Sequence, residues 1–128
     1  MVVAALLCGC VTTGANVKLT PREEAQVFLQ RGEGAKALPL LTELQAKAPA
    51  DLTLARMVAE AHVKAGSADT FLAALATKDT AISHYQQGLV RFARASDASA
   101  PAIANFKRAA ALEPNEPEFR YRLGVALL

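Results

Sequence analysis

The chain has 128 residues, of which 52% are hydrophobic, with alanine the commonest, while only 5% are aromatic and tryptophan is absent. This length allows one domain of ordinary size, and an alanine-rich, aromatic-poor composition favours closely packed helices. The net charge of +2 and the scattering of basic residues among acidic ones give no indication of a nucleic-acid partner.

Residues 1–10 carry no charge, and the next nine residues are small and polar. The segment Leu7-Cys8-Gly9-Cys10 resembles a bacterial lipoprotein box, with residues 11–19 as a flexible tether. The resemblance implies that Cys10 is acylated and anchors the protein in the cell envelope. Val11, where inner-membrane lipoproteins carry Asp, favours the outer membrane, facing the periplasm. Because the apolar run is short and lacks a preceding basic segment, we expect the true start codon to lie upstream.

The first predicted helix begins at Thr20-Pro21-Arg22-Glu23, a capping box with proline in the first turn, and runs to Gly32. The second helix carries an apolar stripe over residues 37–44 and ends at Pro49. Pro39 is tolerable there only if it falls in or near the first turn.

Three aspartates are candidate caps for the next three helices. Asp51 opens a helix that stops at Gly66, Asp69 opens a short helix over residues 71–75, and Asp79 opens a helix over residues 82–92. Ser99 is the candidate cap of a sixth helix.

Ala102, Phe106 and Ala109 share one stripe of that sixth helix, which Pro114 ends, and Phe119 begins a seventh helix containing Gly124. The two helices are joined by a short proline turn and carry small residues where their backbones approach. This arrangement resembles the junction between two tetratricopeptide repeats. Pro49 and Pro114 lie 65 residues apart, close to twice the family period of 34. The resemblance covers residues 18–128, with repeats of about 18–51, 52–80 and 81–116 and a partial fourth from 117. It implies an all-α solenoid of antiparallel helix hairpins with a right-handed superhelical twist.

A lone half-repeat at the end of such a solenoid would leave Phe119, Leu123 and Leu127 exposed. We therefore expect the natural protein to continue beyond Leu128.

The sequence does not predict an active site. The only two histidines, His62 and His84, have no Cys, His or acidic neighbour in metal-ligand spacing, so no metal site is predicted. We interpret His62 as a packing residue and His84 as solvated. Arg120 and Arg122 are interpreted as part of a solvated face. No phosphate loop or nucleophile–base arrangement is recognisable, which favours a non-enzymatic protein without a cofactor or a small-molecule substrate.

The resemblance implies that the first helix of each repeat lines a concave groove that binds a protein or peptide. Mapped onto this sequence, the lining comprises eight residues predicted to bind the partner, Arg22, Gln26, Arg56, Glu60, Tyr85, Leu89, Phe92 and Tyr121, together with Leu29, Val63 and Val125. Aromatic and arginine side chains of this kind are frequent in interface hot spots, although Tyr85 and Phe92 could equally pack between helices.

The predicted function is thus that of a membrane-anchored interaction scaffold of the bacterial envelope, such as an assembly factor. One alternative is a cytoplasmic scaffold whose N-terminus only imitates a lipoprotein signal. Another is the binding arm of a larger envelope enzyme whose catalytic part lies past Leu128.

Overall fold

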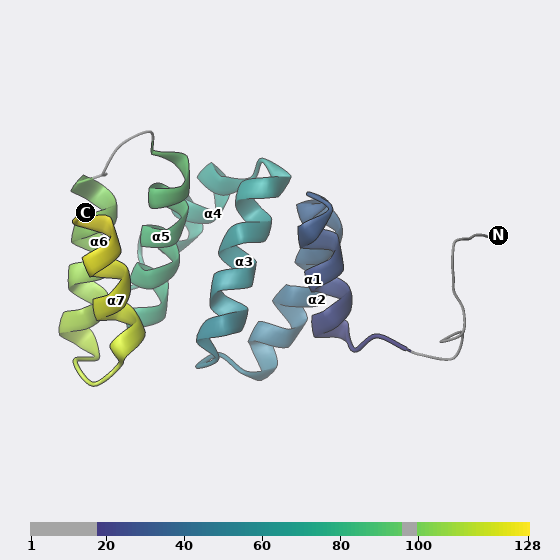
Figure 1. Ribbon diagram of the computed structural model, residues 1–128, viewed down its shortest axis with the longest axis horizontal. Helices are drawn as coiled ribbons and strands as arrows, with labels where there is room; N and C mark the ends of the chain where they lie inside the picture. Colours follow the sequence, from purple (N-terminus) through teal and green to yellow (C-terminus); the bar gives the residue numbers. More distant parts are fainter. Residues whose placement is uncertain (1–17, 96–99) are drawn as a thin grey trace.

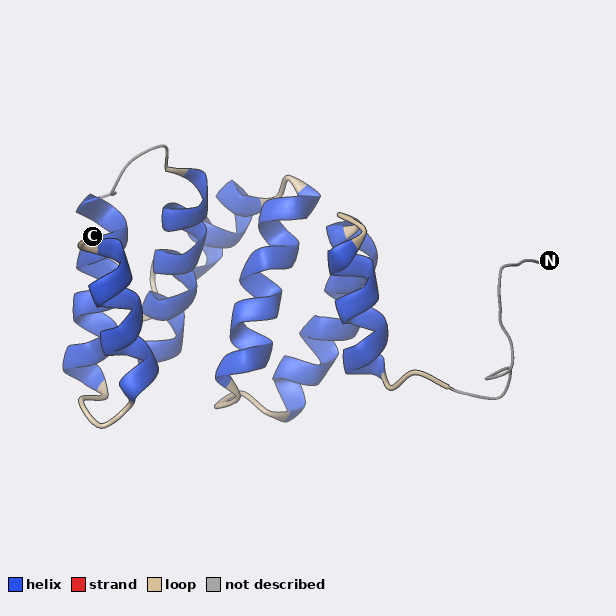
Figure 2. Cartoon of the chain, viewed as in Figure 1, coloured by secondary structure: helices blue, strands red, loops and turns tan. Residues whose placement is uncertain are grey.

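The computed structural model describes residues 18–95 and 100–128, and within these two ranges every regular element is a helix (Figures 1 and 2). The predicted lipid site at Cys10, the tether before residue 18 and the candidate cap Ser99 lie outside the described residues. In chain order the helices are α1 (Pro21–Gln30), α2 (Gly34–Lys47), α3 (Leu52–Ala65), α4 (Ala68–Leu75), α5 (Ala81–Arg94), α6 (Ala100–Leu112) and α7 (Pro117–Ala126).

Local side-chain chemistry sets several of these boundaries as predicted. Thr20 and Glu23 form a capping box at α1, in which each side chain accepts from the other residue's backbone N–H. Asp51 caps α3 by accepting from the backbone N–H of Leu54 at 3.1 Å. Gly66 ends α3 with φ of +77°, a left-handed conformation that glycine adopts without steric cost.

Three predicted helix starts are wrong by one or two residues. The residue before α4 is Ser67, and Asp69 lies in the first turn of that helix. Thr80, not Asp79, caps α5 by accepting from the backbone N–H of Ser83. The seventh helix begins at Pro117, two residues before Phe119.

Pro39 also lies deeper in its helix than expected. It is the sixth residue of α2, because the helix already begins at Gly34. Pro39 is exposed, so the helix lacks one backbone hydrogen bond at a position that faces solvent.

The helices pack mostly as sequential pairs. Each helix contacts the next one in the chain, and α3 also packs along α5. In Figure 1, α3, α5 and α7 run roughly vertically and lie nearer to the viewer, and α4 and α6 lie behind them. Among the described residues the domain is therefore an all-α arrangement of helical hairpins in which α3 and α5, the first helices of two hairpins, are neighbours.

Two main hydrophobic clusters hold the hairpins together. The first joins α1, α2 and α3 through buried residues such as Leu29, Leu41 and Leu54. The second joins α3, α5, α6 and α7, and its largest members are Tyr85, Phe106 and Phe119. The predicted stripe Ala102, Phe106 and Ala109 is fully buried, which confirms the periodicity from which it was derived.

Close helix approach occurs at two glycines. A β-carbon on Gly34 would lie 2.7 Å from the backbone nitrogen of Ala65 in α3, and one on Gly88 would lie 2.6 Å from the ring of Phe106 in α6. Gly124, where the sequence suggested a close approach, has nothing within 4 Å of that position. The close contacts are therefore α2 with α3 and α5 with α6.

Candidate functional site

A cleft of about 360 Å³ opens where α3, α5 and α7 meet. We call it the α3–α5–α7 cleft. Its lining consists of Arg56, Ala59, Glu60, Val63 and Lys64 of α3, Leu89, Phe92 and Ala93 of α5, and Arg122 of α7. The lining combines apolar side chains from α3 and α5 with charged side chains from α3 and α7.

The structure brings together half of the eight residues predicted for partner binding. Arg56, Glu60, Leu89 and Phe92 line the α3–α5–α7 cleft, as does Val63 from the wider predicted lining. Phe92 is 38% exposed, so its ring is available to a ligand. These residues come from the first helices of the second and third predicted repeats.

The other four predicted residues lie elsewhere. Arg22 is paired with Asp51, with 2.6 Å between its Nη2 and the carboxylate Oδ2, and Gln26 is exposed on α1. Tyr121 is 62% exposed on α7 but does not line the cleft. Tyr85 is only 1% exposed, so its ring packs inside the fold instead of facing a partner.

Tyr85 connects α5 to α7. Its ring centroid lies 5.3 Å from that of Phe119, and its hydroxyl donates to the Glu118 carboxylate at 2.7 Å. Burial raises the pKa of Tyr85 above its usual range, and the bond to Glu118 raises it further. This contact explains why a residue expected on an open face became part of the core: α7 covers it.

Glu118 stays ionised beside this tyrosine. Arg122, one turn later, donates to it from Nε at 2.7 Å. Burial raises the pKa of Glu118, but the hydrogen bonds from Arg122 and Tyr85 outweigh burial and hold this pKa below its usual range. A second depression, of about 440 Å³, lies over this group and shares Arg56 and Arg122 with the α3–α5–α7 cleft.

The cleft lining holds three cations, Arg56, Lys64 and Arg122, and one anion, Glu60, while Glu118 lies outside the lining. Lys64 pairs with Glu60 at 3.1 Å and Arg122 pairs with Glu118. Arg56, which is partly buried and lines both depressions, has no hydrogen bond or ion pair from its side chain to the rest of the described chain. A guanidinium in this position can offer its donors to a ligand.

Sequence reasoning missed Lys64 and Arg122. Arg122 was interpreted as part of a solvated face, but it is partly buried at the cleft. The spacing of four between Glu118 and Arg122 on one helix was the available signal for this pair. The spacing of four between Glu60 and Lys64 was the same kind of signal, whereas the bond from the Lys64 ammonium to the Leu29 carbonyl at 2.7 Å joins residues far apart in the sequence and gave none.

The two histidines take part in local packing. His62 stacks on Phe71 with ring centroids 4.0 Å apart, which confirms its expected packing role. Its Nδ1 lies 2.8 Å from the Ser67 hydroxyl, but within the described ranges no acidic group bonds to its other nitrogen, as a catalytic triad would require. Burial lowers the pKa of His62.

His84 is not solvated as expected. Its Nε2 lies 2.7 Å from Asp79 and its Nδ1 lies 3.2 Å from the amide nitrogen of Asn105. Arg108 donates twice to the same Asp79 carboxylate, and these bonds, with the one to His84, hold the pKa of Asp79 well below its usual range. The group therefore connects α6 to the loop before α5.

The described residues contain neither a metal-binding cluster nor a membrane-spanning helix. In residues 18–95 and 100–128, no three His, Cys, Asp or Glu side chains cluster in a way that could hold a metal ion. None of the helices in these ranges combines the length and hydropathy needed to cross a bilayer.

No protein-family model matches the chain, and neither a curated protein nor a solved structure shows significant similarity to it. The likeness to tetratricopeptide repeats therefore depends on the residues and helix order described above.

Proposed function

We propose that this protein is a non-enzymatic interaction domain that holds an extended segment of a partner protein in the α3–α5–α7 cleft. The observation that carries the proposal is the composition of this cleft, whose lining includes both the 38% exposed ring of Phe92 and the guanidinium of Arg56, which has no ion-pair partner among the described residues. Aromatic and arginine side chains that are accessible in one depression are the groups that contribute most to protein interfaces.

The proposal includes the architecture implied by the family resemblance, a tetratricopeptide-like solenoid with a right-handed twist. It is supported by the order of helix contacts, because α3 and α5 pack side by side while each also packs on its own hairpin partner. The short α4 fits this order as a shortened second helix of the middle hairpin. In such a stack the first helices face the ligand, and the α3–α5–α7 cleft is lined by these helices alone.

We further propose that the protein acts at the bacterial envelope, held by lipid on Cys10 in the outer membrane and facing the periplasm, as an assembly factor. Support comes from the segment Leu7-Cys8-Gly9-Cys10 and the polar residues after it. The cellular role rests on this segment and on the family resemblance.

The cleft is testable without a known ligand. The probe is a phage-displayed library of random heptapeptides, selected on the immobilised full chain. We expect the selected peptides to carry an aromatic or aliphatic residue together with Asp or Glu, because the cleft offers apolar side chains and a guanidinium, Arg56, that has no ion-pair partner among the described residues. Phe92→Asp should weaken their binding at least tenfold, and Arg56→Gln should remove the preference for acidic residues.

Tyr121→Asp is the matched control, since Tyr121 is an exposed aromatic residue outside the cleft. Circular dichroism would verify that each variant keeps its helices. Failure to select any peptide, or equal binding by Phe92→Asp and the wild type, would contradict the proposal.

A further inference from the structure

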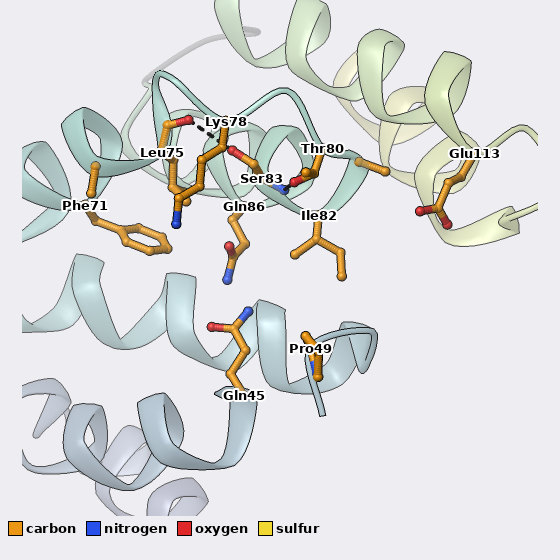
Figure 3. Close-up of a pocket in the computed structure, with 12 residues that line it drawn as sticks. Gln45, Pro49, Phe71, Leu75, Lys78, Thr80, Ile82, Ser83, Gln86 and Glu113 are labelled. Atoms are coloured by element: carbon orange, nitrogen blue, oxygen red, sulfur yellow. Dashed lines mark hydrogen bonds between the residues drawn. The ribbon is translucent and has the colours of Figure 1, made fainter. Parts of the chain in front are cut away.

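A further hollow, separate from the two depressions described above, lies beside the short helix α4. This helix has 8 residues, whereas α2, α3 and α5 have 14 each. The hollow has a volume of about 450 Å³ and also borders α2 and α5 (Figure 3). We call it the α4 hollow and define it by Phe71, Leu75, Lys78, Ile82, Gln86 and Gln45. It shares no lining residue with the α3–α5–α7 cleft.

Two carboxamides face each other across the hollow. Figure 3 shows the side chains of Gln45, from α2, and Gln86, from α5, pointing into the space between them. Gln86 is 3% exposed, and its Nε2 donates to the Ala55 carbonyl at 3.1 Å. Its Oε1 and the whole amide of Gln45 have no hydrogen-bond partner in the described part of the chain.

These amide atoms line the hollow without a bond to the described chain, so a ligand that enters it can bond to them. The carboxamide of Gln45 offers both a carbonyl acceptor and an N–H₂ donor, and Gln86 offers its Oε1 acceptor. A peptide bond offers the complementary pair of groups, one N–H and one C=O. The hollow therefore presents the hydrogen-bonding groups that match a peptide backbone.

The rest of the lining adds an apolar wall and two charges. Phe71, Leu75 and Ile82 form the wall. The ammonium of Lys78 lies on the Phe71 side, and the carboxylate of Glu113 stands at the other side, beyond Ile82 (Figure 3). Neither charge has an ion-pair partner among the described residues.

We propose that the α4 hollow binds a short peptide with free ends. The peptide lies extended, with a backbone amide between Gln45 and Gln86 and an aliphatic side chain against Phe71 and Leu75. Its carboxylate end faces Lys78 and its ammonium end faces Glu113, so that charges of opposite sign meet at both sides. The volume of the hollow lies within the range of sites that enclose small ligands.

The tripeptide Ala-Leu-Ala, with free ends, is the probe, and it is titrated into the isotope-labelled full chain in a ¹H–¹⁵N NMR experiment. We expect saturable shifts of the side-chain amide signals of Gln45 and Gln86 and of backbone signals in α4. The same tripeptide with acetylated and methylamidated ends should bind at least threefold more weakly, because it lacks both end charges.

Gln45→Leu should lower the affinity for the tripeptide with free ends on the order of fivefold, since the net contribution of one hydrogen bond to binding is modest. The variant tests a ligand contact without disturbing the fold, because Gln45 makes no hydrogen bond within the described chain. Gln30→Leu, an exposed glutamine at the end of α1, is the matched control and should bind as the wild type does.

Three results would overturn the proposal: shifts that never saturate or map elsewhere, equal binding of the capped and free tripeptides, or unchanged affinity of Gln45→Leu. The outcome is independent of the cleft experiment, since the two sites have different residues and different probes.

Discussion

Replacing Gly34 by alanine tests the packing that brings α2 against α3. The added methyl group would lie 2.7 Å from the backbone nitrogen of Ala65 and still closer to the carbonyl oxygen of Ala61, whereas ordinary contacts begin at 3.4 Å. Both obstructing atoms belong to the backbone of α3, so no side chain can rotate away. The two helices must separate instead.

The expected magnitude follows from two opposing effects. Forcing extra volume into a packed contact costs about 1–3 kcal/mol, and a rigid backbone neighbour places Gly34→Ala near the upper end. Removing glycine lowers the entropy of the unfolded chain, which returns about 0.5–1 kcal/mol. We therefore expect Gly34→Ala to lower the free energy of unfolding by about 2 kcal/mol.

Urea unfolding followed by circular dichroism at 222 nm measures this free energy. Gly124→Ala is the control, because an alanine there meets nothing within 4 Å and should stabilise α7 by about 0.5 kcal/mol. If Gly34→Ala matched or exceeded the wild type in stability while Gly124→Ala behaved as expected, the close approach of α2 to α3 would be refuted.

Two further predictions concern the core and the N-terminus. Tyr85→Phe should lower the free energy of unfolding by about 1–2 kcal/mol, because it removes a hydrogen bond to a charged carboxylate. Tyr121→Phe, at an exposed position, should leave this free energy unchanged. Equal effects of the two substitutions in urea unfolding would contradict the burial of Tyr85. In bacterial cells, the protein should incorporate radiolabelled palmitate at Cys10, so Cys10→Ser should abolish labelling while Cys8→Ser keeps it. A labelled Cys10→Ser variant would contradict the assignment of Cys10, and an unlabelled wild type would argue for the alternative without a lipid anchor.

Much of the candidate cleft could be predicted from the sequence, because residues three, four and seven positions apart share one face of a helix. The family resemblance implied that Arg56, Glu60 and Val63 line a groove, their spacing puts them on one face of α3, and the cleft contains all three. The same rule could not place Tyr85 or Tyr121, because it gives the face of a helix but not the neighbour that covers it.

The sequence by itself determined the local features of the fold. A capping box, an aspartate cap and a left-handed glycine depend on hydrogen bonds between residues three or four positions apart, so Thr20, Asp51 and Gly66 already identify the ends of their helices.

Other features, such as the cap of α5 and the burial of Tyr85, depend on contacts between residues far apart in the sequence. Only the tertiary structure decided these features. Asp79 does not cap α5, because Arg108 of α6 and His84 take its carboxylate and leave the cap to Thr80. Tyr85 is buried because α7 places Phe119 and Glu118 against it, more than 30 residues later in the chain. Contacts of this kind depend on how helices approach in space, and no local pattern of residues encodes that approach.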